Sequence, residues 1–189
     1  MRQGKLNSAL EKLCQDLESR SIEYMLIGAV ALIAHGYARF TEDIDLVLTR
    51  EGLGKFHNEL IGLGYRPAYD GARKNFRMTQ ENVPIEIIVA GEYPGDGKPK
   101  PVAFPEPHSA SIKIEGIHVV TLDKLIELKL ASGMTAGDRL KDLADVQELI
   151  KARGLGREIA ERLDPFVRDE YLRLYEAVES AKGNEPERW

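Results

Sequence analysis

The segment from residue 24 to residue 48 constrains the fold most, because it predicts two strands joined by a tight turn and a helix. Residues 24–27 are short and apolar, and this run stops at Gly28 and Ala29, after which the composition becomes helical. Residues 40–48 alternate apolar with polar side chains before becoming wholly apolar. This pattern is typical of a strand that enters a hydrophobic core.

The remaining segments predict further strands and a helical C-terminal part. Leucines spaced three and four residues apart predict an opening helix that ends near Ser19. The other expected elements are a helix over 51–63, strands over 76–78 and 83–89, a hairpin over 111–120, and helices over 122–132 and 138–152, with one or two more to about residue 181. Gly133 and Gly154 are expected to stop two of these helices. The fold class is therefore α/β of the α+β kind, a small mixed sheet flanked by helices with a C-terminal helical layer.

The length of 189 residues and the 43% hydrophobic content suit one compact protein. We expect a core over residues 1–120, a helical region over 121–182 packed on that core, and a flexible tail over 183–189. Residues 91–108 contain five prolines and three glycines, too many for regular structure. A loop of this length is commonly either a functional lid or a mobile segment.

The overall charge of the chain limits the classes of partner. The net charge of −5 predicts no general attraction to nucleic acid or to an anionic membrane, so any phosphate binding must be local. A single cysteine, Cys14, excludes an intramolecular disulfide framework and a zinc site of several cysteines. No apolar run approaches the ~20 residues that span a bilayer, and the first residues lack a signal-peptide pattern. We therefore expect a cytoplasmic protein without a membrane partner.

The turn at Gly28 and Ala29 is a candidate nucleotide-binding feature. It ends a strand and opens a helix, so backbone N–H groups and the positive end of the helix dipole converge where a triphosphate would fit. After thirteen intervening residues, Asp43 and Asp45 flank an isoleucine. Alternation along a strand sends both carboxylates to one face, where they repel each other unless a cation lies between them.

Glu86 is a charge in the middle of an otherwise apolar strand, which is a costly placement without a partner. It is the natural third carboxylate, and the alternative is a strand-edge residue that faces solvent. Three carboxylates can hold two Mg²⁺ ions, which would orient a nucleoside triphosphate, activate an attacking hydroxyl and stabilise departing pyrophosphate. Asp43, Asp45 and Glu86 are therefore the candidate catalytic and metal-binding residues.

These residues resemble the pattern of the polymerase-beta-like nucleotidyltransferases, in which an apolar residue, Gly, and Gly or Ser are followed after about nine to thirteen residues by Asp-apolar-Asp. This chain reads Ile27-Gly28-Ala29, thirteen residues, then Asp43-Ile44-Asp45. The resemblance implies that Asp43 and Asp45 bind both metal ions and that Glu86 completes the site and helps to deprotonate the acceptor. Ala29 departs from the pattern, because the family normally has Gly or Ser there, and the missing hydroxyl removes a phosphate contact.

Two downstream segments, 125–131 and 139–146, are similar to the helical part of abortive-infection-type nucleotidyltransferase toxins and related small bacterial proteins. This resemblance implies that Lys129 lies near the nucleotide phosphates, supported by Arg139, Lys141 and Asp142. Lys129 also interrupts an apolar helical stripe, so its ammonium either needs a partner or reaches water along its apolar stem.

Several candidate residues have simpler explanations. Lys141 and Asp145 are four residues apart, so an ion pair on a helix surface explains them adequately. Thr41 either shapes the turn before the aspartates or contacts phosphate. The three cations around Phe76 are usually a solvated face in such hairpins, although contact with an acceptor is the alternative.

The leading hypothesis is Mg²⁺-dependent transfer of a nucleotidyl group from a nucleoside triphosphate to a hydroxyl, with release of pyrophosphate. The acceptor would be RNA, a protein side chain or a small molecule such as an aminoglycoside or lincosamide antibiotic. The runner-up is a catalytically weak or silent protein of the same fold that acts as a binding or regulatory partner, for example within a toxin–antitoxin pair. A phosphoesterase or glycosyltransferase that uses the same aspartates is the third class.

Overall fold

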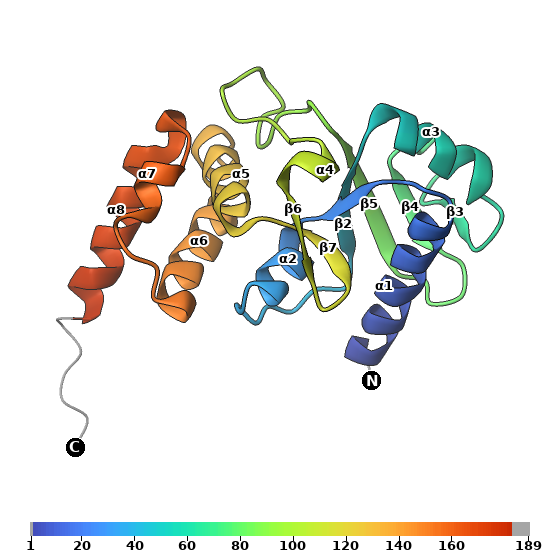
Figure 1. Cartoon of the computed structure of the whole chain (residues 1–189), viewed down its shortest axis with the longest axis horizontal. Helices are drawn as coiled ribbons and strands as arrows, with labels where there is room; N and C mark the ends of the chain where they lie inside the picture. The colour runs from blue at the N-terminus through green and yellow to red at the C-terminus, as the bar shows by residue number, and fades with distance from the viewer. Residues whose placement is uncertain (1, 183–189) are drawn as a thin grey trace. The chain divides into compact units, whose positions relative to one another are not determined.

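The computed structural model describes residues 2–182, with side chains from residue 4 onward (Figure 1). The tail predicted at 183–189 lies outside the described residues. The chain forms two compact units, which do not divide at one position of the sequence. The first, here the sheet unit, comprises Met1–Ala34, Ala38–Glu92 and Phe104–Thr121, and the second, here the helical unit, comprises His35–Tyr37, Tyr93–Ala103 and Leu122–Trp189.

The sheet unit contains a seven-stranded mixed sheet with the strand order β3-β4-β5-β2-β1-β7-β6. Its strands are β1 (Tyr24–Leu26), β2 (Ile44–Leu48), β3 (Tyr65–Pro67), β4 (Asn75–Met78), β5 (Pro84–Val89), β6 (Ser111–Ile114) and β7 (Ile117–Val120). Strand β2 is antiparallel to β1 and parallel to β5, while β1 is parallel to β7. The predicted small mixed sheet is confirmed. The short strand β3 was not predicted.

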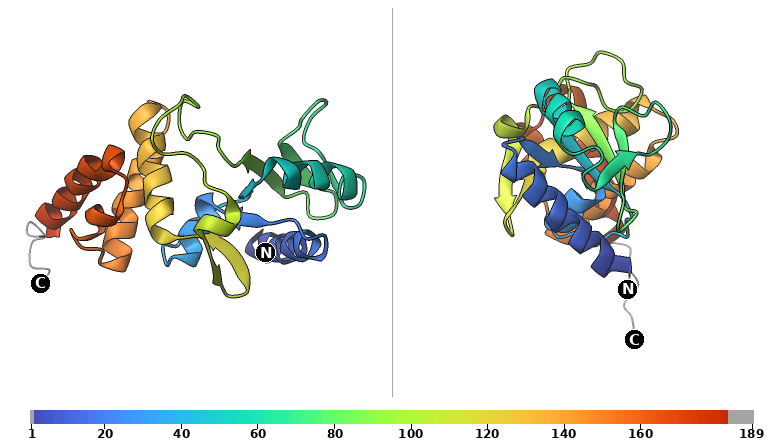
Figure 2. Two further views of the ribbon diagram at one scale, coloured as in Figure 1. Left: turned by 45° about the horizontal axis from the view of Figure 1, so that its top comes forward. Right: turned by 90° about the vertical axis from the view of Figure 1, so that its right-hand side faces the viewer.

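The sheet unit also contains α1 (Arg2–Ser19), α2 (Gly28–Ala34), α3 (Arg50–Glu59) and α4 (Pro107–Ala110). Tyr65 of β3 connects two of these helices to one face of the sheet. Its ring packs edge-on against Phe56 of α3, and its hydroxyl donates a 2.7 Å hydrogen bond to Asp16 of α1. Helices α1 and α3 therefore cover the same face of the sheet, and both can be followed beside the strands in Figure 2.

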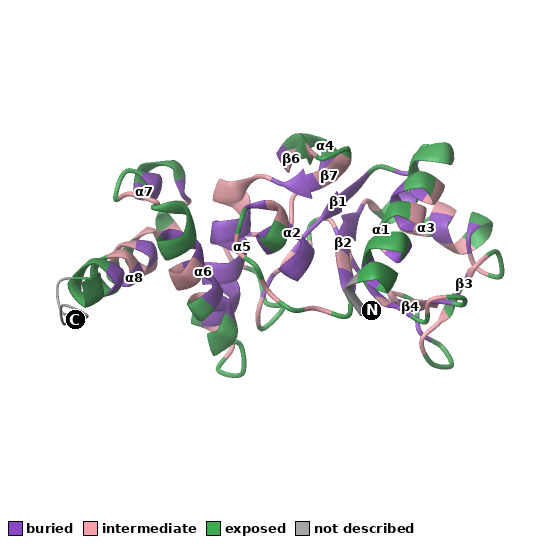
Figure 3. Cartoon of the chain, turned by 90° about the horizontal axis from the view of Figure 1, so that it is seen from below, coloured by how far each residue is buried: buried purple, intermediate pink, exposed green. Residues whose placement is uncertain are grey.

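Burial alternates along the central strands and separates the two faces of the sheet. Ile44 and Leu46 of β2 are fully buried, whereas Asp45 between them is half-buried. In the same way, Ile85 and Ile87 of β5 are buried while Glu86 between them is exposed. Figure 3 shows the resulting contrast between buried strands and the striped surface of α1. The polar side chains of β2 and β5 thus share the face opposite to the apolar core.

The helical unit contains α5 (Leu122–Thr135), α6 (Leu140–Arg153), α7 (Ile159–Arg162) and α8 (Pro165–Lys182). Gly154 ends α6 in a left-handed conformation with φ of 60°, as predicted. The prediction that Gly133 stops a helix was wrong, because α5 continues through it. A Cβ on Gly133 would overlap the side chain of Leu143, so this glycine serves the close packing of α5 on α6.

Part of the proline-rich loop is held by specific hydrogen bonds within the helical unit. The ammonium of Lys100 donates to the carbonyl of Pro94 at 2.7 Å and to Oδ1 of Asp96 at 2.6 Å. Gly95 lies so close to Ser132 of α5 that a Cβ on it would lie 2.8 Å from the Ser132 carbonyl oxygen. This segment therefore has a defined path.

Among residues 2–182, no helix combines the length and the apolar character that crossing a membrane requires.

Candidate active site

Pairing between β1 and β2 brings the predicted turn next to the predicted carboxylates. The two strands are antiparallel, with Leu26 opposite Leu46, so the end of β1 lies beside the start of β2. The N–H of Ile27 donates a 3.0 Å hydrogen bond to the carbonyl of Asp45. Gly28 then begins α2, which gives the strand, turn and helix that the sequence predicts. The turn at Gly28 and the strand residue Asp45 are therefore neighbours in space although they are well separated in the sequence.

Gly28 has two structural reasons to be glycine. Its φ of 61° lies in the left-handed region, which other residues adopt at a cost of about 1–2 kcal/mol. A Cβ at this position would also overlap Oδ2 of Asp45. The Asp45 carboxylate thus lies directly against the backbone of the turn.

Asp43 lies immediately before β2 rather than within it, because the strand begins at Ile44. Its side chain is exposed, and Oδ1 accepts a short hydrogen bond from the hydroxyl of Thr41. The N–H of Asp43 in turn donates a long, 3.4 Å bond to the Thr41 hydroxyl. In this arrangement Thr41 shapes the turn that leads to the aspartates.

Glu86 lies beside Asp45 in the parallel pairing of β5 with β2. Residues in register on adjacent strands are about 4.8 Å apart and point to the same face. Strand β5 lies between β2 and β4, so Glu86 is not on an edge strand, but its side chain does face solvent, as the alternative explanation expects. On its other side, Glu86 is opposite Asn75 of β4. Asp45, Glu86 and Asn75 therefore form one row across three strands.

The carboxylates suit Mg²⁺ in their chemistry, since this ion prefers oxygen ligands. Within residues 2–182, however, no three His, Cys, Asp or Glu side chains converge closely enough to share a metal ion. Mg²⁺ is usually bound by one or two carboxylates together with substrate phosphates and water, rather than by a complete cage of protein ligands. Asp43 and Asp45, with Glu86 on the neighbouring strand, fit that kind of site.

Lys129 belongs to a buried ion cluster in the helical unit, formed by α5 and α6. Its ammonium donates to Oδ1 of Asp142 at 2.8 Å and to Oδ2 of Asp145 at 2.7 Å, and the Ser132 hydroxyl donates to Oδ2 of Asp142 at 2.7 Å. All four residues are at most 8% exposed. The ammonium therefore has two buried carboxylate partners and does not reach water along its stem.

The ionisation of Asp142 reflects this environment. Burial by itself raises the pKa of a carboxyl group, but the nearby charge of Lys129 and hydrogen bonds from Lys129 and Ser132 outweigh it. The pKa of Asp142 consequently lies below its ordinary value of 3.8. The carboxylate form is the one that the folded chain stabilises.

The other residues implied by the second resemblance lie on the outside of the helical unit. Arg139 is exposed and caps α6 without a side-chain hydrogen bond, and Lys141 is exposed on the first turn of that helix. The predicted surface pair of Lys141 with Asp145 was wrong, because Asp145 is buried and bound to Lys129.

The cations near Phe76 are mostly engaged by their own surroundings. Lys74 forms a 2.8 Å ion pair with Glu92, and Nη1 of Arg77 donates a 3.0 Å hydrogen bond to the carbonyl of Asn82. The uncharged neighbour of these cations, Asn75, was missed by the sequence reasoning. Only the strand register could have identified it, and register is not visible in residue spacing.

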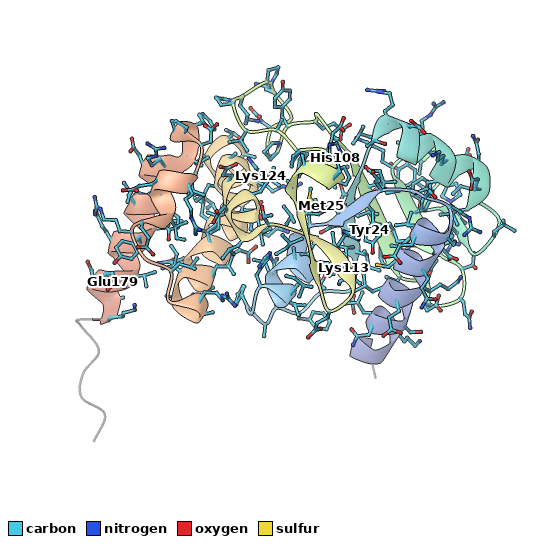
Figure 4. The ribbon with its side chains drawn as sticks, in the orientation of Figure 1. Tyr24, Met25, His108, Lys113, Lys124 and Glu179 are labelled. Atoms are coloured by element: carbon cyan, nitrogen blue, oxygen red, sulfur yellow. The ribbon has the colours of Figure 1, made fainter. Side chains whose placement is uncertain are left out.

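A separate groove of about 510 Å³ lies in the sheet unit at the opposite end of β1 from Gly28. Figure 4 shows three of its residues, Tyr24, His108 and Lys113, which come from β1, α4 and β6. The ring of Tyr24 packs edge-on against His118, and His108 lies 3.7 Å from a carboxylate oxygen of Glu23. Its lining thus contains both histidines and carboxylates.

Comparison with known proteins identifies the fold. No protein-family model matches the chain, and neither does any curated protein sequence. Solved structures do resemble it. The solution structure of the antibiotic-resistance factor ANT(2'')-Ia superimposes with a TM-score of 0.59 and 17% sequence identity, over 98% of this chain and all of that one (100%). The chain has the nucleotidyltransferase fold.

Two further structures share this fold. ANT(2'')-Ia in complex with adenylyl-2''-tobramycin aligns with a TM-score of 0.56 and 16% identity, over 93% of this chain and 97% of that chain. A Thermotoga maritima protein, provisionally assigned as a nucleotidyltransferase, aligns with a TM-score of 0.56 and 15% identity, over 76% of this chain and 93% of its own. At these identities the likeness establishes the fold, and the reaction must be argued from the site itself.

Proposed function

We propose that the protein transfers a nucleotidyl group from a nucleoside triphosphate to a hydroxyl acceptor and releases pyrophosphate, in a reaction that requires Mg²⁺. The observation that carries this proposal is the packing of Asp45 between the Gly28 turn and Glu86 on one face of a nucleotidyltransferase sheet. Asp43, two residues before Asp45, adds a second exposed carboxylate at the same strand end.

In this proposal each residue has a separate role. Asp43 and Asp45 would hold Mg²⁺ together with the substrate phosphates, and Glu86, on the neighbouring strand, would be the third carboxylate of the site. Backbone N–H groups at Gly28 and Ala29 contact the phosphates, so the backbone supplies what the absent Ser hydroxyl at position 29 does not. When bound, Mg²⁺ supplies charge stabilisation for the phosphates.

The transfer step exchanges one bond at phosphorus for another. The acceptor oxygen forms a bond to the α-phosphorus while the bond from that phosphorus to the bridging oxygen breaks, and pyrophosphate leaves. Glu86 accepts the proton of the attacking hydroxyl. The two oxygens are in line at phosphorus in such displacements, so the acceptor and the pyrophosphate lie on opposite sides of it.

The acceptor is proposed from the classes that the sequence leaves open, namely RNA, protein or a small molecule such as an antibiotic. The ANT(2'')-Ia complex contains an adenylylated antibiotic, which supports a small hydroxyl-bearing acceptor as one class to test.

The buried ion cluster leaves the ammonium of Lys129 bound to two carboxylates, so we propose that this residue holds α5 to α6.

The test compares Asp43→Asn and Asp45→Asn with the wild type. Each of the four α-labelled nucleoside triphosphates is incubated with Mg²⁺ and a panel of acceptors comprising transfer RNA, a cell protein extract and tobramycin, and label transfer and pyrophosphate are measured. Both variants should lose transfer by more than the ~10–100-fold that outer-shell changes cost at metal sites. Asp169→Asn, which changes an exposed carboxylate on α8, is the control and should match the wild type. Full transfer by both site variants would exclude this mechanism.

A silent binding protein is the second candidate, because no three potential metal ligands converge within residues 2–182. Such a protein would act as a regulatory partner, for example in a toxin–antitoxin pair. Calorimetry with Mg²⁺ and the four triphosphates distinguishes the candidates in combination with the transfer assay. Binding that is lost in Asp45→Asn, without transfer to any acceptor of the panel, would favour this second role.

A further inference from the structure

The row of side chains that contains Asp45 and Glu86 continues for one more strand. Glu86 of β5 is in register with Asp45 of β2 on one side and with Asn75 of β4 on the other. Phe76, which follows Asn75, is fully buried, whereas Asn75 itself is half-buried. Asn75 therefore points to the same open face of the sheet as the two carboxylates.

The two sides of Glu86 differ in what surrounds them. Toward β1, the Asp45 carboxylate lies against the backbone of Gly28, and the protein fills that side. Toward β4, the next polar side chain is Asn75, and its amide makes no side-chain hydrogen bond with any residue that the structure describes from 4 to 182. On the side of Glu86 away from Asp45, the Asn75 amide is thus available to hydrogen-bond a ligand.

This asymmetry matters for the place of the acceptor hydroxyl. If Asp43 and Asp45 hold the nucleotide and its metal ion and Glu86 accepts the proton of the acceptor, the acceptor hydroxyl must lie within hydrogen-bonding reach of Glu86, whose neighbour on the side away from Asp45 is Asn75. A group at Asn75 then meets the acceptor rather than the triphosphate. We propose that Asn75 is a positioning residue for the acceptor hydroxyl, an inference that rests on the proposed nucleotidyl transfer.

The chemistry of an amide suits this position. Its N–H groups donate and its carbonyl oxygen accepts, so it can hold a hydroxyl in one orientation beside Glu86. A carboxylate on β4 would repel Glu86, and a lysine would pair with it and compete for the proton-accepting oxygen. The nearby cations Lys74 and Arg77 interact with Glu92 and with the carbonyl of Asn82, so the neutral amide of Asn75 is the polar group next to Glu86 on this side.

The experiment measures acceptor and nucleotide separately, using whichever acceptor of the panel the wild type labels. Asn75→Ala should reduce kcat/KM for that acceptor by about tenfold or more, while Mg²⁺-dependent binding of the triphosphate, measured by calorimetry, stays within about twofold of the wild type. Asn58→Ala, which truncates an exposed amide on α3, is the matched control and should change neither quantity.

A second variant separates hydrogen bonding from shape. Asn75→Asp keeps the size of the side chain but replaces the donor by a carboxylate that repels Glu86, so it should be at least as impaired as Asn75→Ala. Wild-type transfer by Asn75→Asp, or an equal loss of nucleotide affinity and transfer in Asn75→Ala, would overturn the assignment. If the wild type itself labels no acceptor, the proposed function fails and this inference with it. If the wild type is active and Asn75→Ala is equally active, only this inference fails.

Discussion

The protein contains two groups of acidic side chains that its structure treats in opposite ways. In the helical unit, Asp142 and Asp145 are buried around the ammonium of Lys129. In the sheet unit, Asp43 and Glu86 are exposed and make no salt bridge with the described residues, and Asp45 is half-buried on β2 with its carboxylate against the backbone of Gly28. The chain thus supplies the cation for the two buried carboxylates, whereas the exposed carboxylates of Asp43 and Glu86, which we propose bind a ligand, remain accessible to solvent.

The largest expected effect tests the buried half of this comparison. Lys129→Met should reduce the free energy of unfolding by about 3–5 kcal/mol, because it leaves two buried carboxylates without their cation. Chemical denaturation measures the change, and Lys141→Met, an exposed lysine on the same helix pair, should have little effect. Combining Lys129→Met with Asp142→Asn and Asp145→Asn should restore part of the lost stability. A loss below about 1 kcal/mol for Lys129→Met would mean that the cluster behaves like a surface ion pair.

The next largest effect is expected at Gly28, where the backbone lies directly against the carboxylate of Asp45. Gly28→Ala should cost about 1–2 kcal/mol, since alanine is strained at a positive φ, and its methyl group would displace the Asp45 side chain. Mg²⁺-dependent nucleotide binding should fall with it. The matched control is Gly54→Ala in α3, where a Cβ meets open space and where alanine should stabilise the helix by about 0.5–1 kcal/mol. Unchanged nucleotide binding in Gly28→Ala would show that the Gly28 turn does not contribute to the nucleotide site.

The pH dependence of stability gives a smaller and more specific signal. Because the folded pKa of Asp142 lies below 3.8, its contribution is complete above that pH and is lost as the pH falls through the lowered pKa. The stability difference between the wild type and Asp142→Asn should therefore be constant near neutral pH and shrink below pH 3.8. Denaturation at a series of pH values measures it, with exposed Asp169→Asn as reference. A difference that stays constant into strong acid would contradict the ion pair.

The smallest effect on stability is expected for the exposed carboxylates of the sheet unit. Asp43→Asn and Glu86→Gln should change the free energy of unfolding by no more than about 0.5 kcal/mol, although they remove proposed catalytic groups. Thermal denaturation without Mg²⁺ provides the measurement. A destabilisation of several kcal/mol would show that these carboxylates are structural, like those around Lys129.

Local sequence patterns predicted much of the sheet unit, and tertiary contacts explain what they missed. The strand–turn–helix at Gly28 and the hairpin over 111–120, which turns at Glu115 and Gly116, depend on residues within a few positions of one another, and both are present. Strand β3 has only three residues and includes Pro67, so it carries little periodic signal. The helix stop expected at Gly133 was wrong, because this glycine makes room for the side chain of Leu143, which belongs to the next helix.

The same distinction applies to the site residues. Spacing alone placed Asp43 and Asp45 on one strand end, and an unexpected charge singled out Glu86. Residue spacing could not identify the partners of Lys129, which lie 13 and 16 residues further along the chain across a helix–helix contact. Nor could it show that Asn75 lies opposite Glu86, since register depends on pairing between strands.

The antiparallel pairing of β1 with β2 also determines what the interval between glycine and aspartate means. Hydrogen bonds between the strands, and not the helix and connection that join them, set the distance from Gly28 to Asp45. The intervening residues can therefore change in number without moving the two groups apart. A motif defined by a fixed interval would describe the connection, whereas the property that the site requires is that one strand ends where its neighbour begins.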